Sequence, residues 1–290
     1  MIHPVEPKKV LCIHDLSGMG RCSLAVILPV LSVMGLQPVA LPTVVLSTHT
    51  GGLGTPARLD GCAYGEAALE HYHALGLDFD CIYTGYLGGE AQVALAEKAF
   101  ALWPAAKKIV DPVMGDNGRP YSTYTPELIR RMKELVDVAD IITPNITETC
   151  MLLGEECPAM MSVSQARSWL ARLSDKPRIV VIKGVPLIDD DGQKLSNIGF
   201  DRESGSFWRI DWDHIPVHYP GTGDILTSVL TASLLKGESL PIALNRATTF
   251  TEIAVKTTYS YGTEPRLGVL FEDCLSWLMT NTVLSDYRKL

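Results

Sequence analysis

The sequence lacks the features that would assign it to a membrane, to nucleic acid or to the secretory route. No apolar run approaches the length of a membrane span, and the N-terminus has no signal-peptide pattern. Basic residues are in deficit, since 25 Lys and Arg against 33 Asp and Glu give a formal net charge of −8. This balance argues against non-specific nucleic-acid binding as the main role. We therefore expect a cytoplasmic protein with no membrane partner and no nucleic-acid partner.

The seven cysteines lack the patterns of a metal or redox site. Their number is odd, no Cys-x-x-Cys occurs, and several lie within apolar runs. Reduced thiols are the favoured interpretation, and neither a zinc site nor a thiol nucleophile is indicated. Two nucleotide-binding motifs are missing as well. There is no Gly-x-x-x-x-Gly-Lys-Ser/Thr, which excludes a P-loop enzyme, and Gly18-Met19-Gly20 lacks the last glycine of a dinucleotide-binding loop.

Short apolar segments alternate with segments of helical spacing along most of the 290 residues. This alternation predicts an α/β fold, a mostly parallel central sheet with helices on both faces, in one domain over residues 1–290. Strands are expected at residues 9–13, 38–46, 79–84, 107–110, 140–143 and 178–184. Helices are expected at residues 22–34, 65–75, 90–102, 126–136, 164–173, 225–235, 241–258 and 267–279. Residues 195–200 and 206–210 predict an antiparallel hairpin at one edge of the sheet.

Polar residues recur just after the expected strands. In an open parallel sheet the ligand lies at the carboxyl ends of the strands, so these side chains are expected to converge along one edge. They are Asp15, His49, Tyr86, Asp111, Asn145, Lys183 and Asp224.

The most informative stretch is residues 219–230, where Gly221 and Gly223 precede Asp224 and an apolar run of helical spacing. Two glycines before a helix can form a nest of backbone N–H groups that binds an anion. A carboxylate beside such a nest is suited to take a proton from an alcohol that attacks a bound phosphoryl group. An ordinary Asp N-cap on a core helix explains the same residues equally well.

Two other acidic motifs have two interpretations each. Asn145 and Glu148, three apart at the start of a helical run, offer oxygen ligands for Mg²⁺ but also match a helix-capping pair. Asp111, stiffened by Pro112, suits a fixed position near a metal or a phosphate, and a plain acidic turn competes.

Three further residues are ambiguous when taken alone. Lys183 could contact phosphate or lie at the surface, and His49 could donate to a ligand or simply pack in its loop. Tyr86 could stack on a flat ring or belong to the core.

Together, these motifs resemble the ribokinase superfamily and, within it, the vitamin B6 (pyridoxal, pyridoxamine and pyridoxine) kinases. Gly221-Thr222-Gly223-Asp224 matches the anion-hole and base motif, and Asn145-x-x-Glu148 matches the magnesium motif. The motifs that are more particular to the B6 kinases are Ser47-x-His49-Thr50-Gly51, Thr84-Gly85-Tyr86-Leu87-Gly88, Asp111-Pro112-Val113-Met114-Gly115-Asp116 and Asp140-Ile141-Ile142-Thr143-Pro144-Asn145. They occur in the family's order and span the chain from the first strand to the helix after Asp224.

The resemblance implies a ribokinase-like three-layer sandwich that transfers phosphate from ATP, with Mg²⁺, to the 5′-hydroxymethyl group of a B6 vitamer. Asp224 would be the catalytic base, and Gly221, Thr222 and Gly223 would form the anion hole. Asn145 and Glu148 would place Mg²⁺, through water or directly. The nucleotide side would comprise Asp111, Tyr121, Asn145, Glu148 and Lys183. The pyridine side would comprise Asp15, Thr43, His49, Thr50 and Tyr86. A homodimer and a requirement for a monovalent cation are further implications.

The chain departs from the family at two positions. Asp15 occupies a position where many pyridoxal kinases carry serine, and its carboxylate could accept from a ring N–H or a 4-aminomethyl group. Leu46 stands where an aromatic residue is often found. Two alternatives stay open: a hydroxymethylpyrimidine kinase of the same superfamily, and a non-catalytic binder of pyridoxal phosphate or nucleotide on this fold.

Overall fold

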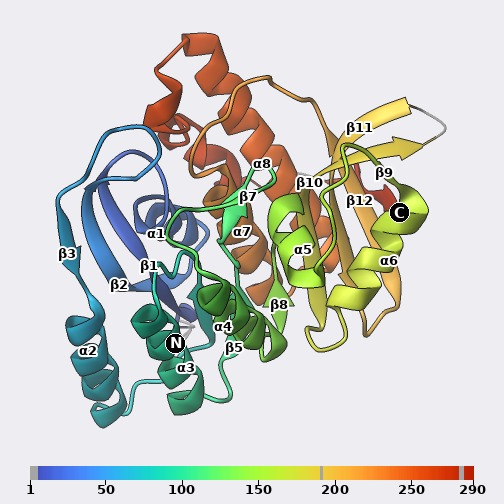
Figure 1. Ribbon diagram of the computed structural model, residues 1–290. Coiled ribbons are helices and arrows are strands. Elements are labelled where there is room, and N and C mark those ends of the chain that lie inside the picture. Colours follow the sequence, from blue (N-terminus) through green and yellow to red (C-terminus); the bar gives the residue numbers. More distant parts are fainter. Residues whose placement is uncertain (1–5, 190–191, 281–283) are drawn as a thin grey trace, which may run out of the picture.

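The computed structural model describes residues 6–189, 192–280 and 284–290. One sheet runs through it in the order β13-β12-β11-β10-β8-β5-β4-β1-β2-β3, with β9 beside β10 (Figure 1). The predicted single domain over residues 1–290 extends to residues 1–5, 190–191 and 281–283, which lie outside the described residues.

The centre of the sheet is parallel, as the alternating sequence pattern predicts. Strands that are buried on both faces have continuous runs of apolar residues, which is typical of parallel sheets covered by helices. These strands are β1 (Lys9–Met19), β2 (Gln37–Thr48), β4 (Cys81–Thr84), β5 (Lys107–Val110), β8 (Ile141–Ile142) and β10 (Ile179–Asp189), with β9 (Met161–Ser162) pairing β10 in parallel.

Antiparallel strands extend both edges of the sheet. The predicted hairpin is confirmed as β11 (Gly192–Asp201) and β12 (Ser206–Trp212), and β13 (Arg288–Lys289) pairs with β12. At the opposite edge β3 (Arg58–Asp60) pairs with β2.

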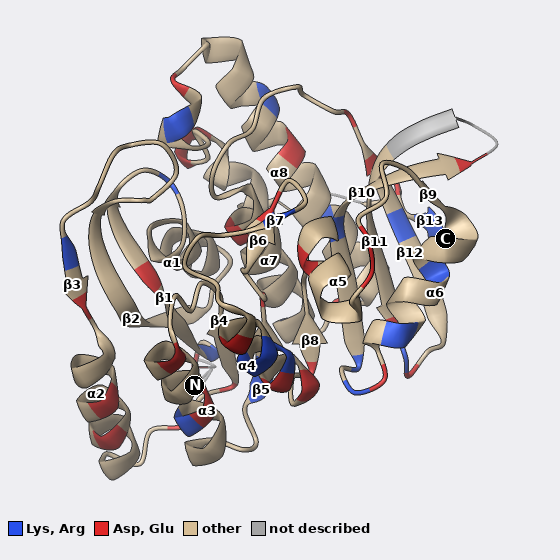
Figure 2. Ribbon diagram, viewed as in Figure 1, with Lys and Arg blue, Asp and Glu red and all other residues tan. Residues whose placement is uncertain are grey.

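Helices cover both faces, which makes the three-layer sandwich that the sequence predicts. One buried cluster packs under α2 (Cys62–Ala74), α3 (Glu90–Leu102), α4 (Pro126–Asp137), α5 (Ile146–Leu153) and α6 (Val163–Leu173). The other packs under α1 (Leu24–Val33), α7 (Thr222–Leu235), α8 (Leu240–Tyr261) and the 3₁₀ segment η2 (Glu272–Met279). Within the described ranges, no helix is both long and apolar enough to cross a membrane. Acidic and basic residues are interspersed over the elements (Figure 2).

Three local expectations differ from the structure. The strand expected at residues 9–13 continues to Met19 as β1, which pairs with β2 past a bulge between His14 and Leu16. The helix expected at 267–279 is replaced by η1 (Pro265–Leu267) and η2, which residues 268–271 separate. Gly268 in this gap has a φ of 79°, which ends a helix. A small hairpin, β6 (Gly115–Asp116) and β7 (Arg119–Pro120), was not expected. Its Asn117-Gly118 turn, with φ of 52° and 74°, is a strong hairpin signal that was available in the sequence.

Candidate active site

Asp111, directly after β5, and Lys183, within β10, form an ion pair across the parallel part of the sheet. The Lys183 ammonium lies 2.8 and 2.7 Å from the two carboxylate oxygens of Asp111. Thr227, one helical turn after Asp224 on α7, donates its hydroxyl to Asp111 Oδ2 at 3.0 Å. The end of β5 and the middle of β10 are therefore tied to α7, and the predicted convergence of Asp111, Lys183 and Asp224 is consistent with this arrangement. The strand end expected at residue 184 is wrong, because β10 continues to Asp189 past an irregularity between Ile182 and Val185.

The start of α7 leaves backbone N–H groups available for an anion. Gly221 is the N-cap, with φ of 85°, and no side chain caps the helix. The first N–H groups of a helix have no acceptor within it and lie at the positive end of its dipole. A Cβ on Gly221 would lie 1.9 Å from the Arg21 carbonyl oxygen, and one on Gly223 would lie 3.3 Å from Lys183 Nζ. Glycine at 221 thus permits the turn, and the Lys183 ammonium lies beside the nest.

Asp224 is the third residue of α7, so the interpretation of Asp224 as an N-cap is wrong. Its Oδ2 instead accepts a hydrogen bond of 2.8 Å from the backbone N–H of Ser23, before α1. Burial is the main cause that raises the pKa of Asp224 to about 7. The charges of Asp111 and Asp15 act in the same direction, whereas the Ser23 N–H and the Lys183 ammonium lower the pKa. A carboxyl group that titrates near neutral pH is suited to act as a general base.

Asn145 and Glu148 form a complete capping box at the start of α5. Glu148 N donates to Asn145 Oδ1 at 2.8 Å, and Asn145 N donates to Glu148 Oε2 at 2.7 Å. Met114 N donates to the other carboxylate oxygen of Glu148 at 3.3 Å. Burial, opposed by the charge of Lys183, raises the pKa of Glu148 to about 8. The capping interpretation is therefore confirmed, and it leaves a further lone pair on each carboxylate oxygen.

This donor set fits Mg²⁺ through water. No group of three or more His, Cys, Asp or Glu that could hold a metal occurs among the residues that the structure describes. Mg²⁺ usually keeps several waters and is bound by one or two carboxylates together with substrate phosphates. Asn145 and Glu148 suit that mode, since most of the remaining ligands come from phosphate and water.

Asp15, which the resemblance assigns to the pyridine side, is buried and accepts hydrogen bonds from two hydroxyl groups. Ser17 Oγ donates to one carboxylate oxygen at 3.1 Å, and Ser23 Oγ donates to the other at 2.5 Å. Burial raises the pKa of Asp15, although both serine hydroxyls act against the shift. Thr43, in β2, is also fully buried, and its hydroxyl has no partner among the described residues. A ligand group could satisfy that hydroxyl.

His49 is buried, and backbone groups engage both of its ring nitrogens. Gly51 N donates to Nδ1 at 2.9 Å, and Nε2 lies 2.6 Å from the Arg266 carbonyl oxygen. Both ring nitrogens are thus engaged, which leaves the ring face, rather than a nitrogen, for a ligand. The next residue, Thr50, is exposed.

Two tyrosines lie near the β6–β7 hairpin. Tyr86 is half-buried after β4, and its hydroxyl lies 2.9 Å from Thr123 Oγ1. Tyr121 follows β7 and is 40% exposed. His218 Nδ1 lies 3.6 Å from Asp116 Oδ2, so the hairpin reaches the segment that precedes α7.

Sequence reasoning missed Ser23 and Thr227. Thr227 lies three residues after Asp224 on one helix face, and that spacing was the available signal. Ser23 carries no local signal, because its role depends on contacts with Asp15 and Asp224.

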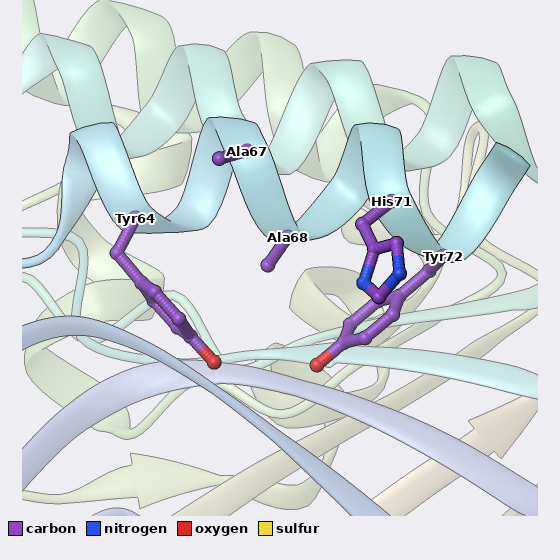
Figure 3. A pocket seen from close by; sticks show the side chains of 5 residues that line it. All are labelled: Tyr64, Ala67, Ala68, His71 and Tyr72. Carbon is purple, nitrogen blue, oxygen red and sulfur yellow. The ribbon is translucent and has the colours of Figure 1, made fainter.

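Two surface hollows contain none of the predicted site residues. One lies on α2 between Tyr64 and Tyr72, whose rings flank Ala67 and Ala68 (Figure 3). The other lies over β2 and β3, between Val45 and Leu59. The chemistry described above lies instead at the strand ends.

The three-layer fold, with its polar residues gathered at the strand ends, is that of the ribokinase-like enzymes. A family model described as phosphomethylpyrimidine kinase matches residues 67–267. The pyridoxal kinase of Lactobacillus plantarum is 32% identical, with a TM-score of 0.85 over 94% of this chain and 96% of that one. A Bacteroides thetaiotaomicron protein, provisionally named a phosphomethylpyrimidine kinase and crystallised with pyridoxal, is 40% identical, with a TM-score of 0.92 over 98% and 100% of the two chains. The pyridoxal kinase PdxY of Deinococcus radiodurans is 26% identical over 90% of this chain and 91% of its own length. The chain belongs to the family of phosphomethylpyrimidine and pyridoxal kinases.

Proposed function

We propose that this protein is a pyridoxal kinase, which transfers the γ-phosphoryl group of ATP to the 5′-hydroxymethyl group of pyridoxal, pyridoxamine or pyridoxine. The observation that carries the proposal is the start of α7. There Asp224, with a pKa of about 7, lies within one turn of the uncapped N–H groups that follow Gly221. Base and anion site thus lie on one short segment. The similarity to pyridoxal kinases supports the choice of substrate.

In this mechanism Asp224 accepts the proton of the substrate hydroxyl as its oxygen attacks the γ-phosphorus. The bond to the β–γ bridging oxygen breaks, and ADP leaves. The N–H groups of Gly221, Thr222 and Gly223 stabilise negative charge on the transferred group, and the nearby Lys183 ammonium adds to this effect. Positioning and electrostatics account for most of the catalysis in such reactions.

The nucleotide would lie along the strand ends on the α5 side. Its contacts are proposed to come from Asp111, Tyr121, Asn145, Glu148 and Lys183. Mg²⁺, held through water by Asn145 and Glu148, would neutralise charge on the phosphates. A monovalent cation is a further proposed requirement, to be tested by potassium titration.

The vitamer would lie over the ends of β1, β2 and β4. Its surroundings are proposed to be Asp15, Thr43, His49, Thr50 and Tyr86. The Asp15 carboxylate would accept from a ring N–H or an aminomethyl group, and the Thr43 hydroxyl would find its partner in the ligand. His49 would contribute its ring face, because both nitrogens are engaged.

We also propose a homodimer located in the cytoplasm. The edge strand β3 supports self-association, because Leu59 is 67% exposed beside the hollow between β2 and β3. Sedimentation at several protein concentrations tests the oligomeric state.

A coupled assay for ADP release tests the main proposal with four substrates: pyridoxal, pyridoxamine, pyridoxine and hydroxymethylpyrimidine. We expect turnover with at least one B6 vitamer, and kcat/KM for that vitamer above the value for hydroxymethylpyrimidine. The family model favours the second candidate, a hydroxymethylpyrimidine kinase, and the reverse ranking would establish it. Ligand binding without any turnover would instead identify a non-catalytic binder.

A further inference from the structure

Ser23 has a backbone conformation that serine rarely adopts. Its φ is 51° and its ψ is −136°. In the described part of the chain, Asn117 is the other non-glycine residue with positive φ, and it lies in an Asn-Gly turn where such values are ordinary. Strained backbone persists only where the surrounding contacts hold it, and it is often associated with function.

Ser23 donates two hydrogen bonds, one to the buried carboxyl group of Asp15 and one to the partly buried carboxyl group of Asp224. Its carbonyl oxygen accepts from Val26 N and Ile27 N at the start of α1. Its backbone N–H donates to Asp224 Oδ2 at 2.8 Å, and its hydroxyl donates to Asp15 Oδ1 at 2.5 Å. Ser23 itself is 7% exposed, and Asp15 is 4% exposed. A single residue thus connects the bulge of β1, where Asp15 lies, to Asp224 on α7.

The conformation and the contacts depend on each other. Left without its hydroxyl anchor, an L-residue at this position would relax toward negative φ, and its N–H would turn away from Asp224. Asp224 would then lose the hydrogen bond that orients its carboxylate and favours its ionised form. Glycine, in contrast, adopts these angles without strain.

We propose that Ser23 is a positioning residue for the catalytic base, and that Asp15 acts on Asp224 through the Ser23 hydroxyl. The inference rests on the proposed function in treating Asp224 as the base. It assigns Asp15 a second task besides ligand contact, since the carboxylate that faces the vitamer also orients the base.

Several groups face Asp224, and each influences its titration. Asp111 after β5 and Asp15 on β1 raise its pKa, whereas Lys183 on β10 and the Ser23 N–H lower it. Tyr83 on β4 and Cys22 before α1 also lie within electrostatic reach. The first experiment therefore changes Ser23 alone and leaves all these groups in place.

The first experiment compares S23A with S23G, which both lack the hydroxyl. We expect S23A to lower kcat about tenfold, in line with the sensitivity of such reactions to small displacements, while KM for ATP stays constant. S23G should lose clearly less kcat than S23A. The pKa of the Asp224 carboxyl, followed by ¹³C NMR and assigned by its loss in D224N, should rise in S23A and stay closer to the wild-type value in S23G.

Equal losses of kcat in the two variants would show that the hydroxyl itself acts, and would overturn the positioning role. An S23A variant with the kcat of the wild type would overturn it too. The NMR measurement needs no turnover. A wild-type protein inactive with every vitamer would therefore refute the proposed function, whereas an unchanged Asp224 pKa in S23A would refute the inference.

The second experiment tests the part played by Asp15. D15N and D15A both remove the charge, but the asparagine oxygen can still accept from the Ser23 hydroxyl. At saturating vitamer, kcat of D15A should lie several-fold below that of D15N. In the S23G background the two Asp15 variants should have similar kcat, since glycine needs no anchor. A gap of the same size in both backgrounds would show that Asp15 does not act through Ser23.

Discussion

The Lys183 ammonium contacts both carboxylate oxygens of Asp111, a residue 72 positions earlier in the chain. Both side chains are largely buried, with exposed fractions of 12% for Lys183 and 1% for Asp111. The pair lies at the same sheet edge as the start of α7, because Lys183 Nζ also lies beside Gly223. One cation therefore compensates a buried carboxylate and faces the proposed phosphate site.

Removing the cation alone should destabilise the fold strongly. We expect Lys183→Met to lower the free energy of unfolding by about 3–5 kcal/mol, because Asp111 is left as an uncompensated buried charge. The matched control is Lys176→Met, which breaks the exposed pair with Asp137 and should cost about 0–1 kcal/mol. Urea denaturation measures both. The double variant D111N/K183M should recover part of the loss, and a K183M variant as stable as K176M would show that the pair contributes little.

The pKa of Asp224 predicts the acid limb of the activity profile. The base must be ionised to accept a proton, so kcat/KM should fall about tenfold per pH unit below about pH 7. Asp224→Asn should lower kcat by about 10²–10⁴-fold while the affinity for nucleotide changes little. Steady-state kinetics across pH, with nucleotide binding by calorimetry, measures both. Activity within about tenfold of the wild type would contradict the assignment of the base.

The same group should make the fold less stable as the pH rises. Its pKa is raised from 3.8 to about 7, so between these values the unfolded chain releases a proton that the folded chain retains. The stability cost is absent below 3.8, grows with pH, and is complete above about 7. Asp224→Asn should therefore be more stable than the wild type at about pH 8 and similar to it at about pH 4. Thermal unfolding at the two pH values measures the difference, and a difference that does not change with pH would refute the raised pKa.

Much of the fold could be predicted from the sequence, and so could the places of several candidate site residues in it. Buried parallel strands give continuous apolar runs, and Asp111 directly follows one of them, whereas Lys183 proved to lie within β10. The β6–β7 hairpin was predictable in principle from Asn117-Gly118. The contacts of Ser23 with Asp224 and of Thr227 with Asp111 could not be predicted. They join residues 201 and 116 positions apart and depend on packing rather than on a local sequence pattern.

The sequence left two interpretations open for Asp224 and two for the pair Asn145 and Glu148, in each case a helix cap or a role in the site. Asp224 proved to be the third residue of α7 and not its cap, since Gly221 takes that position. Asn145 and Glu148 did form a capping box. Helix boundaries decide between such alternatives, and a glycine with positive φ is a better sign of the boundary here than the acidic residue after it.

Gly221 should be intolerant of any side chain. It combines a φ of 85° with a Cβ position 1.9 Å from the Arg21 carbonyl oxygen. Gly237 is the matched control, because its φ is 91° but nothing lies within 4 Å of its Cβ position. We expect Gly237→Ala to cost about 1 kcal/mol of stability, and Gly221→Ala to cost more and to reduce kcat as well. Similar stabilities and unchanged kcat in the two variants would show that the close approach to Arg21 is unimportant.

Glu148 caps α5 and is also proposed to bind Mg²⁺ through water, and one variant can distinguish these two roles. Glu148→Gln keeps one acceptor oxygen but presents an NH₂ group to a backbone N–H, so part of the capping box is lost. It also removes the charge that attracts the ion. We expect a modest loss of stability, about 0.5–2 kcal/mol, together with a higher Mg²⁺ concentration for half-maximal activity.

The control is Ser162→Ala. The Ser162 hydroxyl is the N-cap of α6 and accepts from Gln165 N, so this variant removes a helix cap far from the site. It should lower stability by a similar amount and leave the Mg²⁺ dependence unchanged. If both variants shift the Mg²⁺ curve equally, or neither does, Glu148 acts only as a cap.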